Sequence, residues 1–194
     1  MSQQERAAWD ERFHTGDHAG AEPDPFLEQL AEYAGLFPAG RREGPKALDV
    51  ACGAGRNAVY LAEHGWDVTA CDISLEGLHK ASALAQGRGV ALRLFCQDLE
   101  TLWLPPNSFD LIVCFFYLQR NLFSVLKAAL RPRGLIVYKT YTIDQRRFPG
   151  RPRHPMHLLR PQELLEVFRE YRVLTYQEIV KDRGVAQLIA QKPE

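Results

Sequence analysis

The sequence predicts an α/β protein with a Rossmann-like, doubly wound sheet of seven strands and helices on both faces. Apolar runs of strand length alternate with segments of helical spacing, and a glycine-rich turn joins the first run to a helix. The chain closes with two apolar runs separated by the short turn 181–184. Such a turn makes the last two runs an antiparallel hairpin, so we expect a mostly parallel sheet whose last strand is antiparallel.

Each element follows from its own local pattern. In the first helix Trp9 and Phe13 are four residues apart on one face, and the glycines and prolines between 14 and 25 predict a loop. No repeat or linker divides the chain, so we expect one domain over 1–194, with a helical cap at 1–36 and a Rossmann-like core at 46–194. Strands are predicted at 46–51, 67–71, 90–95, 109–115, 134–141, 171–180 and 185–191, and helices at 3–13, 26–36, 56–64, 75–86, 120–130 and 161–169.

Length and charge limit the classes of function. A chain of 194 residues buries about 70% of its unfolded surface and needs no covalent staples. Its 24 basic and 24 acidic side chains cancel, which argues against nucleic acid and membrane surfaces as partners. No apolar run approaches the ~20 residues that span a bilayer, and no signal-peptide pattern opens the chain. A cytoplasmic location is therefore expected.

Four cysteines lie at or near the ends of predicted strands, and no Cys-x-x-Cys pair is present. Zinc sites use such short spacings, so no metal site is predicted. Small buried hydrophobes suit these places, and we expect reduced thiols. The four residues are Cys52, Cys71, Cys96 and Cys114.

The most informative stretch is 46–73, KALDVACGAGRNAVYLAEHGWDVTACDI. It has the order strand, loop, helix, strand, in which a parallel sheet presents a nucleotide-like ligand to its carboxyl edge. Gly53 and Gly55 permit a positive φ and a close approach of a ligand. Asp72 follows Gly53 by 19 residues, at a strand end where a carboxylate can accept hydrogen bonds from two ribose hydroxyls. An adenosine-containing cofactor is predicted.

Several interpretations of the glycine turn are compatible with the residues alone. GAGRNA fits a dinucleotide fingerprint, so a nicotinamide-dependent oxidoreductase is one alternative, and an ordinary strand-to-helix turn is another. A triphosphate loop is excluded because no Gly-Lys-Ser/Thr follows. Asp49 disfavours the dinucleotide reading, since a carboxylate in a strand packed between helices is costly without a partner.

An acid in the strand followed by x-x-x-Gly-x-Gly resembles the first motif of the class I S-adenosylmethionine-dependent methyltransferases, and the expected terminal hairpin agrees with their topology. The narrower likeness is to the small-molecule branch around tellurite-resistance and thiopurine-type methyltransferases. It implies an amino-terminal cap that closes over the cofactor, although a helix that only covers the sheet is an alternative. The motifs are WDERF at 9–13, DPF at 24–26, GAGRNAVYLAEHGWDV at 53–68 and LRP at 159–161.

The resemblance implies S-adenosyl-L-methionine as cofactor and assigns its contacts. The acid of the first strand would lie near the cationic methionine end, the second acid would hold the ribose, and Asp98 with the next backbone amide would meet the adenine. Asp98 can equally cap a turn. Arg56 and Arg12 compete for the methionine carboxylate, and Phe116 is expected in the core. The predicted cofactor residues are Trp9, Arg12, Asp49, Ala51, Gly53, Gly55, Arg56, Asp72, Ile73, Asp98, Leu99 and Phe115.

Methyl transfer depends mainly on in-line positioning and the exclusion of water, so the catalytic residues are left open. The stretch CFFYLQR after the fourth strand has no Asn-Pro-Pro-Tyr-type clamp, which argues against amino methylation of nucleobases or glutamine. Tyr117, Tyr141 and His157 are the polar candidates near an acceptor. The expected partner is a small-molecule methyl acceptor, and the protein itself is expected to be a monomer or a homodimer. The remaining alternative is a cofactor-binding protein without catalytic activity that partners another protein.

Residues 145–162 carry five arginines and two histidines without one acid. Prolines flank the histidines, which predicts an extended loop on the carboxyl edge of the sheet. The loop favours an anionic small acceptor; a phosphate backbone or a purely solvated loop are alternatives. The charged residues are Arg146, Arg147, Arg151, Arg153, His154, His157 and Arg160.

Overall fold

Seven strands form one sheet in the order β3-β2-β1-β4-β5-β7-β6. The computed structural model describes residues 3–16, 20, 22–37, 44–150 and 152–194. The predicted mostly parallel sheet with a terminal antiparallel hairpin is confirmed, because β7 pairs antiparallel with both β5 and β6 while the other pairs are parallel. The strands are β1 Lys46–Val50, β2 Asp67–Asp72, β3 Arg93–Cys96, β4 Phe109–Phe115, β5 Leu130–Tyr141, β6 Arg172–Val180 and β7 Gly184–Gln191.

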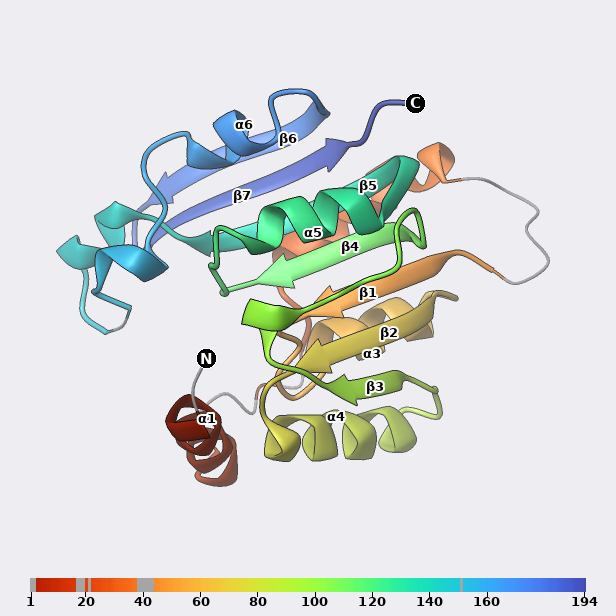
Figure 1. Ribbon diagram of the computed structural model, residues 1–194, viewed down its shortest axis with the longest axis vertical. Coiled ribbons are helices and arrows are strands. Elements are labelled where there is room, and N and C mark those ends of the chain that lie inside the picture. The colour runs from red at the N-terminus through yellow and green to blue at the C-terminus, as the bar shows by residue number, and fades with distance from the viewer. Residues whose placement is uncertain (1–2, 17–19, 21, 38–43, 151) are drawn as a thin grey trace.

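Helices cover both faces of this sheet (Figure 1), because the strands bury apolar side chains on both sides. One layer contains α5 and α6, and the other contains α2, η1, α3 and α4. The α-helices are α1 Gln3–His14, α2 Pro25–Glu28, α3 Arg56–Glu63, α4 Leu75–Gly87, α5 Leu122–Ala129 and α6 Glu163–Val167, and the 3₁₀ helices are η1 Gln29–Leu36, η2 Leu99–Thr101, η3 Ile143–Arg147 and η4 Pro155–His157.

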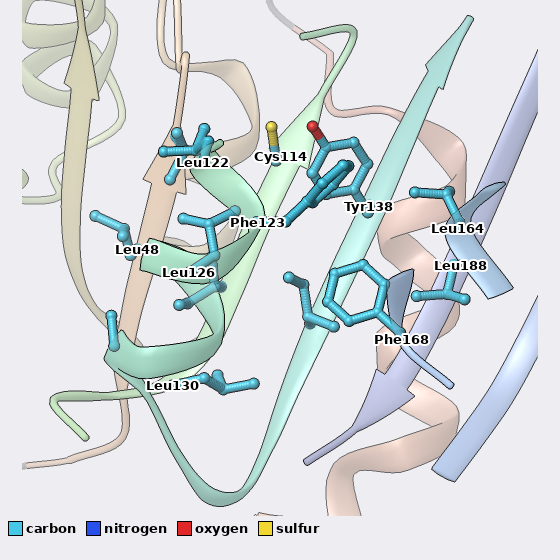
Figure 2. Packing of buried hydrophobic residues seen from close by; sticks show 14 of the residues in the cluster. Leu48, Cys114, Leu122, Phe123, Leu126, Leu130, Tyr138, Leu164, Phe168 and Leu188 are labelled. Atoms are coloured by element: carbon cyan, nitrogen blue, oxygen red, sulfur yellow. The ribbon is translucent and has the colours of Figure 1, made fainter. Parts of the chain in front are cut away.

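The larger core cluster lies between the sheet and α5. Figure 2 shows Leu122, Phe123 and Leu126 of α5 above strands β1, β4 and β5. The Phe123 ring lies 5.3 Å from Tyr138 of β5 and 5.9 Å from Phe168. Burial of each large apolar side chain stabilises the fold by about 1.5–3 kcal/mol. The burial of this cluster therefore fixes the register of the central strands and the position of their carboxyl ends.

The described elements differ from the prediction at a few boundaries. β5 begins at Leu130 rather than 134, because Leu130 already pairs with Phe109 before a bulge. β3 begins at Arg93 rather than 90. The helix expected over 26–36 is a single α-turn followed by the 3₁₀ helix η1. The loop 145–162 contains parts of η3 and η4 instead of being fully extended.

The four cysteines are free thiols, as predicted. Cys52, Cys71 and Cys114 are buried and Cys96 is partly buried. Burial raises the pKa of each of the three buried thiols. They act as small core residues at the ends of the central strands. Among the described residues, no helix combines the length and the apolar character needed to cross a bilayer.

Candidate functional site

The strand order reverses between β1 and β4, which both run toward the edge that α1 and the loop after β5 flank in Figure 1. In open α/β sheets, ligands bind at such a switch point, outside the carboxyl ends of the strands. Two non-glycine residues there have left-handed backbones: Ala51, just after β1, and Phe116, just after β4, both with φ of 57°. Conformations of this kind cost about 1–3 kcal/mol and cluster at functional sites.

The turn after β1 packs closely on its neighbours. Gly55 has φ of 81°, and a Cβ placed on it would lie 2.5 Å from the Cβ of Ala81 in α4. Gly53 has φ of 54°, and its Cβ position faces the ring of Phe13. Both glycines therefore have the positive φ that the sequence predicted. Their immediate neighbours are α4 and α1, so they serve packing inside the protein as well as any ligand.

Asp49 is the buried acid of β1, with 1% of its surface exposed. Among the influences on its pKa, the backbone N–H of Ala58, in the first turn of α3, favours the ionised form of Asp49. Its Oδ2 atom is buried without a hydrogen-bond partner among the described residues. Burial, and then the charge of Asp72, raise the pKa of Asp49 to about 8. The neutral acid therefore predominates below that pH.

Asp72 ends β2 and joins two loops. The backbone N–H of Gly53 donates to its Oδ2 at 2.8 Å, and that of Ser74 donates to its Oδ1 at 2.9 Å. Burial raises the pKa of Asp72, while these amide hydrogen bonds oppose the rise. Each carboxylate oxygen still has a free lone pair, so Asp72 can bind a further pair of donors beside the glycine turn.

The residues predicted around the adenine occupy different environments. Ile73 is 5% exposed. The Oδ1 atom of Asp98 accepts from the backbone N–H of Glu100 at 2.9 Å. In this contact the Asp98 side chain caps η2, which was the alternative to a role at the adenine. Leu99 has its side chain in the core, and its backbone carbonyl accepts from Nε2 of Gln119 at 3.3 Å.

The two phenylalanines after β4 correct one expectation. Phe115 is 7% exposed and belongs to the core cluster on the α3 face. Phe116, expected in the core, is only partly buried, and its ring lies 5.2 Å from that of Tyr141. The left-handed φ at Phe116 breaks the alternation of the strand, so both phenylalanines face the same side of the sheet.

Three polar candidates for the acceptor site, Tyr117, Tyr141 and His157, share no hydrogen bond or ring contact in the described part of the chain. The Tyr117 hydroxyl donates to Oε1 of Gln119, and burial raises the pKa of Tyr117, which makes it a poor base. The Tyr141 ring lies beside that of Phe116, with the two ring planes tilted by 45°. His157 is exposed in η4, with its ring 6.2 Å from that of His154.

The predicted cationic residues lie to either side of the turn. Arg12 stacks its guanidinium 4.7 Å from the ring centre of Trp9, within α1. Arg56 begins α3, and its Nη2 atom lies 4.0 Å from Oδ2 of Asp24. The structure brings Arg12 to the cap and Arg56 to the loop before α2.

A buried ion pair between Asp24 and Lys139 was missed by sequence reasoning. Nζ of Lys139, in β5, donates to Oδ1 of Asp24 at 2.7 Å, and both side chains are mostly buried. Asp24 also caps α2, and its backbone N–H donates to Oδ1 of Asn57. The Lys139 ammonium lies 5.7 Å from the ring centre of Phe116. The DPF motif singled out Asp24, but no local pattern indicated that its partner is Lys139, 115 residues away.

These features fit a cationic, adenosine-containing cofactor. A carboxylate with spare lone pairs at the end of β2 suits a ribose. The buried Oδ2 of Asp49, which lacks a partner among the described residues, suits a nearby positive charge. The two residues with left-handed backbones, Ala51 and Phe116, lie after the two strands of the switch point. Phe116 also belongs to the aromatic pair with Tyr141.

Comparison with known proteins agrees with this chemistry. Residues 47–134 match a methyltransferase domain family. The glycine/sarcosine N-methyltransferase of Halorhodospira halochloris is 30% identical over 154 residues, which cover 73% of this chain and 52% of that protein. The ubiquinone biosynthesis O-methyltransferase of Idiomarina loihiensis is 35% identical over 121 residues, which cover 59% and 46% respectively. The chain therefore spans about half the length of these curated relatives.

The solved structure of TehB from Haemophilus influenzae superimposes with a TM-score of 0.71 and 18% identity, covering 94% of this chain and 67% of that one. At this identity the likeness concerns the fold alone. The nicotinamide alternative finds no support in these matches. The chain is thus similar in sequence to methyltransferases and in fold to the class I S-adenosylmethionine-dependent enzymes, whose cofactor is S-adenosyl-L-methionine.

Proposed function

We propose that the protein transfers the methyl group of S-adenosylmethionine to a small-molecule acceptor. The observation that carries the proposal is the pair of buried acids, Asp49 and Asp72, on either side of the Gly53 turn. One acid has an unpaired buried oxygen and the other has spare lone pairs at a strand end. This combination suits a cofactor that is positive at one end and has a ribose diol further along.

Four residues would hold the cofactor. Asp72 would accept hydrogen bonds from the ribose hydroxyls, and Ile73 would cover one face of the adenine. The Leu99 amide would meet the adenine ring edge. The positive charge of the methionine end would favour the ionised form of Asp49, which is neutral below about pH 8 without the cofactor, and the resulting carboxylate would offset that charge. The cofactor supplies a methyl group on a good leaving group. The protein then needs chiefly to orient the acceptor and to exclude water.

Phe116 and Tyr141 would form the acceptor side of the site. Their rings lie 5.2 Å apart and tilted by 45° at the carboxyl ends of β4 and β5, where they can orient an acceptor. The Tyr117 hydroxyl is already bonded to Gln119, so Tyr117 serves better as a wall than as a base. The names of the matched relatives include an N- and an O-methyltransferase, so nitrogen and oxygen acceptors belong in a screen beside sulfur acceptors.

A screen with isotopically labelled S-adenosylmethionine tests the activity. Pools of small amines, phenols, thiols and carboxylic acids would be offered to the protein, with Asp72→Ala as the negative control. With cofactor well below saturation, we expect labelled product from at least one pool with wild type and at least about tenfold less with the variant. Cofactor binding without labelled product from any pool would favour the non-catalytic partner protein instead.

We further propose that the acceptor is anionic. Arg146 and Arg153 are exposed in the loop after β5, and Arg153 donates to the backbone carbonyls of Arg146 and Phe148. Their charges have no acidic partner among the described residues, whereas Arg147 pairs with Asp144 and Arg160 with Glu163. Arg151 lies outside the described residues.

Salt and charge removal test this finer proposal. If the loop steers an anion, kcat/KM should fall as salt is added, since screening acts within about 10 Å at 0.1 M. Arg146→Gln with Arg153→Gln should reproduce the salt effect, and Arg133→Gln, an exposed arginine that pairs with Glu194, should not. Activity that responds to neither change would make the loop a solvated segment and would overturn the proposal of an anionic acceptor.

A cytoplasmic location is also proposed. Support comes from the free thiols, which persist where the surroundings are reducing. Fractionation of cells that produce the protein would test it, and recovery with the membrane or secreted fraction would contradict it.

A further inference from the structure

Gly77 is a glycine in a helix, where that residue costs about 1 kcal/mol relative to alanine. It lies in the first turn of α4, and its backbone has no left-handed φ that would require glycine. A Cβ placed on it would lie 3.0 Å from Cε2 and 3.1 Å from Cδ2 of Phe13. The missing side chain therefore makes room for an aromatic ring from α1.

The opposite edge of the same ring lies on the glycine turn. A Cβ placed on Gly53 would lie 2.9 Å from Cζ and 3.3 Å from Cε1 of Phe13. The ring thus fills the space between Gly53, which follows β1, and Gly77, which opens α4. The two elements also approach each other directly here: the carbonyl oxygen of Gly53 lies 3.2 Å from the Cβ position of Gly77.

Phe13 is the main apolar attachment of α1. Within this helix, all of which the structure describes, Phe13 alone is buried. Polar contacts add to this attachment: Oδ1 of Asp10 accepts from Oγ of Ser74 at 2.6 Å and from the backbone N–H of Glu76 at 3.2 Å. Lys80 donates to the carbonyl of Phe13. The Phe13 ring is therefore the one fully buried apolar side chain by which α1 is docked.

We propose that Phe13 is a positioning residue for the cofactor. By filling the space between Gly53 and Gly77, the ring holds the cap helix and the cofactor turn in one arrangement. Docking of α1 and binding of the cofactor then reinforce each other, and linkage makes this coupling reciprocal. The proposal rests on the proposed function, because it takes the Gly53 turn as part of the cofactor site.

Gly77→Ala is the direct test, with Gly87→Ala as its matched control. Gly87 lies in the same helix, also without a left-handed φ, and has nothing within 4 Å of its Cβ position. Docking of α1 would be measured without cofactor, as the rate at which trypsin cleaves after Arg6 and Arg12. We expect Gly77→Ala to raise this rate and to weaken S-adenosylmethionine binding, each by about tenfold. Gly87→Ala should change neither.

A rescue separates positioning from general destabilisation. Phe13→Leu introduced into Gly77→Ala should restore both protease protection and affinity in part, because a smaller side chain accommodates the new methyl group. Wild-type cleavage rates in Gly77→Ala would show that the ring does not anchor α1. Faster cleavage with unchanged affinity, or tighter binding, would overturn the coupling; tighter binding would mean that the ring occupies the cofactor's place. If wild type binds no S-adenosylmethionine, the proposed function fails, while the protease result still decides the docking.

Discussion

The Oδ2 atom of Asp72 accepts a hydrogen bond of 2.8 Å from the backbone N–H of Gly53, which ties the end of β2 to the turn after β1. Asp72 therefore shapes the site before any ligand binds. Removing its carboxylate should affect stability as well as affinity.

Asp72→Ala is predicted to lower the free energy of unfolding by about 1–3 kcal/mol, because two backbone amides lose their acceptor. Affinity for S-adenosylmethionine should fall by at least about tenfold, since hydrogen bonds to a charged group contribute roughly 1.5–3 kcal/mol each. Asp67→Ala is the control, because Asp67 lies at the other end of β2 and pairs with the exposed Arg93. Equal affinities for wild type and Asp72→Ala would remove Asp72 from the cofactor site.

Asp49 should make the protein less stable as pH rises. Its folded pKa of about 8 lies above the unfolded value of roughly 3.9. Between these values the native state holds a proton that the unfolded state has released, so the free energy of unfolding falls by up to about 1.4 kcal/mol per pH unit. This contribution is full below the unfolded pKa and is lost as pH approaches the folded pKa.

Asp49→Asn removes this titration. Urea unfolding at about pH 5, 6 and 7 should show a steeper loss of stability for wild type than for the variant. The Asn amide does not titrate, so any destabilisation that it causes lowers the free energy of unfolding equally at the three pH values. Parallel slopes would mean that Asp49 is ionised throughout this range.

Gly55 should tolerate a side chain less well than Gly65 does. Both have a positive φ, 81° and 83°, but only Gly55 would bring its Cβ against Ala81. Alanine should therefore cost Gly65 about 1–2 kcal/mol for the backbone alone and Gly55 more, because α4 must move. Ala81→Gly should rescue part of the loss at Gly55. Thermal unfolding of wild type, Gly55→Ala, Gly65→Ala and the double variant Gly55→Ala with Ala81→Gly measures these differences. Equal losses of stability in the two single variants would rule out the clash.

The ion pair between Asp24 and Lys139 should be strongly coupled. Removing one partner of a buried pair typically costs about 3–5 kcal/mol, because the other charge stays buried. Lys139→Met is predicted to fall in this range, and adding Asp24→Asn should recover part of the loss. Glu194→Gln, in an exposed pair with Arg133, should change nothing measurable. If the losses of the two single variants simply add, the pair is not coupled.

Much of the fold could be predicted because its signals are local. β4 matches its apolar run at both ends, and α3 and α4 begin where the sequence placed them. The hairpin of β6 and β7 followed from one short turn. The placement of Asp72 beside Gly53 follows from the strand–turn–helix–strand order, which brings the ends of two parallel strands together.

The rest depends on contacts that no local pattern contains. Lys139 meets Asp24 across 115 positions of the chain. The left-handed φ of Phe116 places it on the same side as Phe115, whereas strand alternation alone places the two on opposite sides. The reason for Gly77 is a ring from α1, which becomes visible only after the helices are packed.

Isothermal titration calorimetry with S-adenosylmethionine, S-adenosylhomocysteine and NAD tests the central claim most directly. The account predicts saturable binding of the first two to one site, no binding of NAD, and loss of affinity in Asp72→Ala but not in Asp67→Ala. Binding of NAD in place of S-adenosylmethionine, or no binding of either adenosylated compound to folded wild type, would contradict it.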